Sequence, residues 1–98
     1  VQRSSFEDEP FEQKCALLES FAILHRARAL HLLERYLKKG DGILANGQAE
    51  DLGTAAALAL AHVRTAHSVD ILRRACVARN KRIREAARQT FVRLRGDE

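Results

Sequence analysis

Three stretches of the sequence can be laid over one another without gaps, and this internal repeat constrains the fold more than any other feature. They begin at Lys14, Gly53 and Arg84 and read KCALLESFAIL, GTAAALALAHV and REAARQTFVRL. Small and apolar residues recur in four shared columns: Ala16/Ala55/Ala86, Leu17/Ala56/Ala87, Phe21/Leu60/Phe91 and Leu24/Val63/Leu94. Steps of three and four residues are the period of a helix face, and a unit too thin to bury that face alone must stack on its neighbours. We therefore expect stacked helical units in which Ala16, Ala55 and Ala86 make equivalent contacts between helices.

The same apolar spacing predicts five helices, at about 10–25, 29–38, 49–63, 66–79 and 81–95. Thr65 and Asn80 are suitable N-caps for the last two helices, and Gly40 is a natural stop for the second. No segment alternates between apolar and polar residues as a half-buried strand does. The sequence thus predicts an all-α domain at 10–95, with a flexible lead-in at 1–9 and a short tail at 96–98.

Two of these segments carry a family resemblance. IREAARQTFVRL at 83–94 resembles the first helix of a HEAT repeat, and ARALHLLERYL at 27–37 resembles its second helix. The resemblance implies a right-handed α-α superhelix of two hairpins and a terminal helix, acting as an adaptor or scaffold for other proteins. In that family the second helices line the concave face, which would expose Arg28, His31, Glu34, Arg35, Asp70, Arg73 and Arg74. Armadillo-type and other helical-hairpin arrays share the pattern and remain open.

Composition excludes several other classes. The chain has 98 residues, enough for one small domain, and no apolar run long enough for a membrane span. Its two cysteines, Cys15 and Cys76, are too few for a disulfide framework and fit a reducing compartment, so we expect a cytoplasmic protein. The four histidines form no pair at the spacing of metal ligands, and no nucleophile–base arrangement is visible. We expect no enzyme activity, no metal and no cofactor.

Charge gives the alternative function. Residues 53–98 contain ten Lys and Arg against four acidic residues. A basic cluster can bind the phosphate backbone of nucleic acid, although no aromatic residue is interleaved to stack on a base. The candidate residues for this alternative are Arg79, Lys81, Arg82, Arg84 and Arg88. The first hypothesis remains an acidic segment of another protein, held at Arg28, His31, Arg35, Asp70, Arg73 and Arg74, because arginine grips carboxylates with two hydrogen bonds.

The two ends of the stack differ. Arg84, Arg88, Gln89 and Arg95 give the last helix a polar outer face, as the terminal unit of a repeat array requires. The first helix has no such cap, so we expect Phe11, Leu18 and Ala22 to face preceding repeats or another copy. Since the sequence contains no Met and begins at Val1, we expect it to be the C-terminal part of a larger protein with preceding domains.

Overall fold

The protein is helical throughout the part that the computed structural model describes, residues 9–43 and 45–96. These residues form no strand, which confirms the all-α prediction. Residues 1–8 of the expected lead-in and 97–98 of the expected tail lie outside the described residues. In chain order the elements are α1 (Phe11–His25), the 3-10 helix η2 (Arg26–Ala29), α2 (Leu30–Gly40), α3 (Gly47–Ala59), the 3-10 helix η3 (Leu60–His62), α4 (Ala66–Ala75) and α5 (Lys81–Gly96).

Polar caps begin the last three helices. The side chains of Asn46, Thr65 and Asn80 each accept a hydrogen bond from the backbone N–H three residues later, at 2.8, 3.0 and 3.1 Å. These bonds satisfy N–H groups that have no partner inside the helix. The caps predicted at Thr65 and Asn80 are therefore confirmed, and Asn46 starts α3 two residues before the predicted boundary.

Two helix ends can be related to particular residues. α1 stops where Arg26 adopts a positive φ of 51°, at the break expected between His25 and Arg26. α4 ends at Ala75, four residues earlier than predicted. Beyond that point Arg88 and Arg84 donate to the carbonyl oxygens of Cys76 and Ala78, at 3.2 Å in each case. Side chains from α5 thus serve the end of α4, which does not continue to Arg79.

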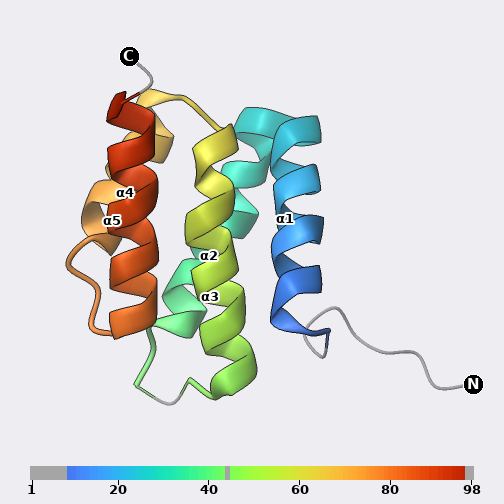
Figure 1. The fold of residues 1–98 in the computed structure, drawn as a ribbon, viewed down its shortest axis with the longest axis vertical. Coiled ribbons are helices and arrows are strands. Elements are labelled where there is room, and N and C mark those ends of the chain that lie inside the picture. Colours follow the sequence, from blue (N-terminus) through green and yellow to red (C-terminus); the bar gives the residue numbers. More distant parts are fainter. Residues whose placement is uncertain (1–8, 44, 97–98) are drawn as a thin grey trace, which may run out of the picture.

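The helices form two layers, visible in Figure 1. Helices α1, α3 and α5 lie side by side and run in the same direction, with α3 in the middle. Helices α2 and α4 lie behind them and run the opposite way. α3 packs against α1, α2 and α5, while α4 packs mainly against α5. The α1–α3–α5 layer therefore has two edges, α1 and α5.

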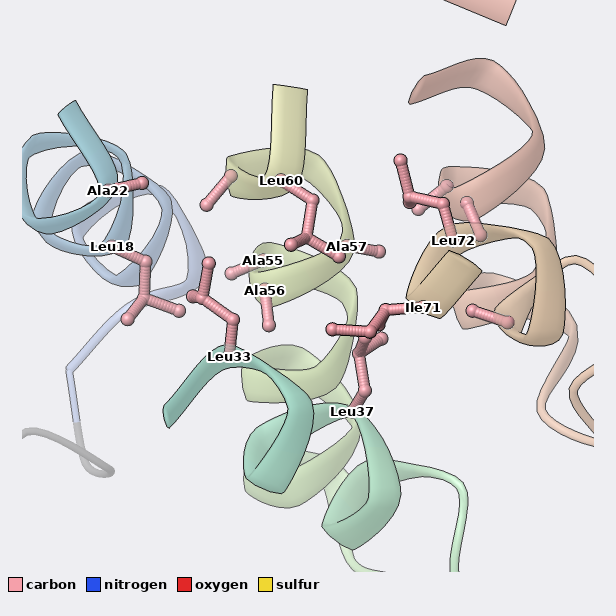
Figure 2. Close-up of a cluster of buried hydrophobic side chains, with 14 of the residues drawn as sticks. Leu18, Ala22, Leu33, Leu37, Ala55, Ala56, Ala57, Leu60, Ile71 and Leu72 are labelled. Atoms are coloured by element: carbon pink, nitrogen blue, oxygen red, sulfur yellow. The ribbon is translucent and has the colours of Figure 1, made fainter. Parts of the chain in front are cut away.

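The core lies between these layers and is centred on α3. Leu18 of α1 lies beside Leu33 of α2, and Ile71 of α4 lies beside Leu37, as Figure 2 shows; Ala22 lies on the same side of α1 as Leu18. All of these side chains are buried. Every residue of α3 from Leu52 to Ala57 is also buried, because helices cover it on several sides. Its alanine-rich sequence gives side chains small enough for neighbouring helices to approach closely.

Helices α2 and α3 approach each other closely at two glycines, one in each helix. A Cβ atom added to Gly40 would lie 2.6 Å from the Ala49 carbonyl oxygen and 3.1 Å from the Gly53 Cα. One added to Gly53 would lie 2.6 Å from the Cδ1 of Ile83 and 3.2 Å from the Gly40 Cα. Gly40 was expected as the stop of the second helix, and it is the last residue of α2, but no described glycine has the positive φ that commonly ends a helix. Its role is instead to leave room for α3 and for Ile83 of α5.

The predicted equivalence of the repeat columns is wrong for the first unit. Ala55 and Ala86 are buried in contacts between helices, whereas Ala16 is exposed. Conversely Leu18 and Ala22, expected on the outer face of α1, are buried against the rest of this domain. The reason is position: α1 is the edge of its layer, so the described helices cover only one of its apolar faces.

Candidate partner-binding face

The outward face of α2 and α4 carries the residues predicted to bind a partner. Arg28 lies in η2, His31 and Arg35 lie in α2, and Asp70, Arg73 and Arg74 lie in α4. All six side chains are exposed. We call these six residues the α2–α4 face. Its residues come from two segments about forty positions apart, and the fold brings these segments into one layer, because α2 and α4 both lie behind α1, α3 and α5.

Part of this charge is neutralised within the protein. The Arg74 guanidinium lies 2.6 Å from the Asp70 carboxylate and 4.0 Å from that of Glu34 on α2. Glu34 also lies 3.7 Å from the ammonium of Lys38. Arg74 therefore joins the two helices and is a poor candidate for an external carboxylate.

The other basic residues of the face are available. The side chains of Arg28, His31, Arg35 and Arg73 form no hydrogen bond or ion pair within residues 9–43 and 45–96. Arginine presents a planar set of donors that matches a carboxylate. The face thus combines three unpaired guanidinium groups with one arginine already held by acids.

A cavity of about 160 Å³ opens beside these charges, between α2, α4 and the start of α5. Most of its lining is apolar, from Leu37, Ile71, Ala75, Ala78 and Ile83. Charged side chains surround it, from Glu34, Lys38, Asp41 and Arg74. An apolar floor with a polar rim can accept an apolar side chain while charges around it set orientation. No sequence pattern indicates this cavity, because its lining comes from segments far apart in the chain.

Most of the residues predicted to bind nucleic acid form contacts within the protein. Arg82 lies 2.6 Å from the Asp51 carboxylate and 3.0 Å from that of Glu50, and its guanidinium lies 5.0 Å from the centre of the Phe11 ring. Arg84 and Arg88 donate to the carbonyl groups that follow α4. Only Arg79 and Lys81 of the five lack such contacts among the described residues. Most of this basic cluster therefore forms ion pairs and hydrogen bonds between elements of the same domain.

Glu50 joins α3 to the start of α5. Its carboxylate accepts a hydrogen bond from the Asn80 side chain at 2.7 Å and one from Arg82 at 3.0 Å. The Asn80 bond, followed by that of Arg82, lowers the pKa of Glu50 below its ordinary value. The Asn80 backbone N–H donates to Asp41 at 2.7 Å, so the loop after α2 joins the same network.

Lys14 is a buried cation of α1 beside this network. Its ammonium lies 3.5 Å from the Gln48 carbonyl oxygen and 4.0 Å from the Asp51 carboxylate. Asp51 is shared with Arg82. These contacts give the buried charge a carboxylate partner, and they lie within the body of the domain rather than at a cleft. We assign Lys14 to the packing of α1 against α3.

Reactive and metal-binding groups are sparse in the described part of the chain. Cys15 and Cys76 are both free and half-buried, and burial raises the pKa of each thiol. A raised pKa leaves less thiolate, the reactive form, at neutral pH. Over residues 9–43 and 45–96, no group of three or more His, Cys, Asp or Glu side chains could hold a metal. No described helix is long and apolar enough to cross a membrane.

Comparisons of the chain with protein-family models, with curated proteins and with solved structures give no match. What the α2–α4 face can bind is therefore inferred from its own charges and from the cavity beside it.

Proposed function

We propose that the protein is a non-enzymatic, protein-binding module, an adaptor or scaffold domain with a HEAT-like right-handed superhelical arrangement. The two antiparallel layers support this proposal, since α1, α3 and α5 take the place of first helices and α2 and α4 that of second helices. In such an array the second-helix layer is the concave, partner-binding side. A cytoplasmic location belongs to the same proposal.

The observation that carries the proposal is the presence of unpaired arginines on η2, α2 and α4 together with an apolar cavity between α2 and α4. Arg28, Arg35 and Arg73 are exposed and unpaired among the described residues, and the cavity floor includes Leu37 and Ile71. A ligand with carboxylates and one aliphatic side chain would meet both features. The partner we propose is an acidic protein segment that contains a leucine or a similar residue.

The test is a titration of ¹⁵N-labelled protein with an acidic, leucine-containing peptide. We expect the amide signals of α2 and α4 to shift, and the shifts to disappear in the triple variant Arg28→Ala/Arg35→Ala/Arg73→Ala. Arg74 is left intact because it joins α2 to α4. A control triple, Arg79→Ala/Lys81→Ala/Arg93→Ala, removes the same charge from the region of α5 and should bind as the wild type does.

If both triple variants lost binding equally, the peptide would be held by non-specific charge attraction. That result would contradict a binding site on the α2–α4 face. A parallel titration with a mixed-sequence DNA duplex examines the nucleic-acid alternative. Salt-sensitive shifts confined to α5, with none on α2 and α4 for the peptide, would replace the proposal with phosphate binding.

A further inference from the structure

The outer side of α1 carries an apolar stripe that no described part of the chain covers. Leu17, Ile23 and Leu24 are 43%, 46% and 75% exposed, and Ala16 and Ser20 between them are exposed as well. Their spacing places all five on one side of the helix. Leu18 and Ala22 bury the other side against the core. α1 forms one edge of its layer in Figure 1, so one side of this helix has no helical neighbour among the described residues.

The internal repeat indicates what kind of element covers such a stripe. Ala16, Leu17 and Leu24 stand in the columns of Ala86, Ala87 and Leu94, which are buried in α5. The principal neighbours of α5 are the helices α3 and α4. The residues of the same columns in the second unit, Ala55, Ala56 and Val63, are also buried. A surface that is covered by helices in two units is therefore exposed in the third, and a helix is the expected occupant.

The other edge of the layer is not complementary to this stripe. α5 exposes Arg88, Gln89, Arg93 and Arg95 on its outer side, together with Val92. Burying these guanidinium groups against leucines would cost desolvation energy with no carboxylate to offset it. Head-to-tail stacking of copies, α5 of one on α1 of the next, is therefore unfavourable.

The stripe is complementary to itself when two copies pack antiparallel. The start of α1 carries Glu9 and Glu12, and its end is followed by Arg26 and Arg28. Antiparallel packing brings the acidic end of each helix to the basic end of the other, whereas parallel packing brings like charges together. We infer that the protein forms a symmetric dimer through α1, with its two-fold axis near Ser20. The contact of one helix face is smaller than a standard interface, so we expect a weak dimer whose population depends on protein concentration.

Sedimentation velocity across a range of protein concentrations tests the dimer. The wild type should shift from monomer to dimer, and Leu17→Glu/Leu24→Glu should remain monomeric at all concentrations. Since both leucines are on the surface, the variant should keep its helical circular dichroism and cooperative melting. The matched control Val92→Glu changes an equally exposed residue, at 67%, and should dimerise as the wild type does.

Cysteine cross-linking tests the antiparallel geometry. In a Cys15→Ala/Cys76→Ala background, Ser20→Cys should form a disulfide-linked dimer on mild oxidation. Gln13→Cys should not, because antiparallel packing places the two copies of position 13 about 20 Å apart along the axis. Cross-linking at both positions would contradict antiparallel packing. A monomer at every concentration, or a dimer that survives Leu17→Glu/Leu24→Glu, would overturn the α1 interface.

Discussion

Two glycines and one isoleucine set how closely the central helices can approach. Gly40 ends α2 inside the protein, where a side chain would collide with the backbone of α3. Gly53 of α3 lies opposite Gly40, and the side chain of Ile83 from α5 lies against both glycines. A glycine inside a helix costs conformational entropy, so its presence at such a point reflects the close packing it permits.

Gly40→Ala should lower the free energy of unfolding by about 1–3 kcal/mol, the usual cost of overpacking. The colliding atom is a backbone oxygen of Ala49, which cannot move aside as a flexible side chain can. The control is Gly47→Ala, where an added Cβ meets nothing within 4 Å. That change should leave stability unchanged or raise it by up to about 1 kcal/mol. Urea denaturation measures both, and equal effects of the two substitutions would contradict the close-crossing explanation.

Side-chain pairing decides how the helices are joined. The start of α5 is joined to α3 by Arg82 and Asn80, and Asn80 also caps α5 itself. The end of α4 is held by Arg84 and Arg88 of the next helix. An arginine-rich segment that resembles a nucleic-acid site in the sequence therefore serves mainly to fix α5 onto its neighbours.

The lowered pKa of Glu50 gives this network a pH dependence. Because the folded state favours the carboxylate, the stabilisation is complete above the ordinary glutamate pKa of about 4.3. It is lost as the pH falls below that value and through the lower pKa of the folded state. Glu50→Gln should therefore be less stable than the wild type at neutral pH, with a difference that narrows below about pH 4.

Chemical denaturation at several pH values measures that difference. Glu85→Gln is the matched control, since the Glu85 side chain is exposed on α5 and forms no hydrogen bond or ion pair among the described residues. The difference in stability between the wild type and Glu85→Gln should not narrow in this way as the pH falls. A constant difference between wild type and Glu50→Gln from neutral to acidic pH would contradict the role given to this carboxylate.

The molecule as a whole is organised around α3. Helices α1, α2 and α5 surround it, and its residues from Leu52 to Ala57 are all buried. α1 and α5 each have an outer side that the described chain leaves uncovered, and α4 is the shortest α-helix. Burial of this kind makes local opening costly at the centre and cheaper at the edges.

Native-state hydrogen exchange should therefore show the slowest amides in α3. Amides near the end of α4 and at the ends of α1 should exchange faster, through local opening. Measurement at a low protein concentration keeps any association through α1 from adding protection there. Exchange in α1 or α4 as slow as in α3 would show that the layers do not depend on the central helix.

The sequence by itself determined the helical class and much of the local structure. Apolar steps of three and four residues gave helices close to their observed positions, and the caps at Thr65 and Asn80 were predicted. These features depend on residues within one or two turns of each other. Helix periodicity and capping are local, so they can be read from the chain without knowing which helices pack together.

Only the tertiary structure decided the features that join distant segments. In the folded protein Arg74 pairs with Glu34, and Arg82 pairs with Asp51. A cavity forms beside Leu37 and Ile71. The tertiary structure also exposed Ala16 while burying Ala55 and Ala86, although all three occupy one repeat column. The physical reason is that burial and pairing depend on which helix lies opposite a residue. Residues in equivalent positions of a repeat have different neighbours when one unit lies at the edge of the layer and another at its centre.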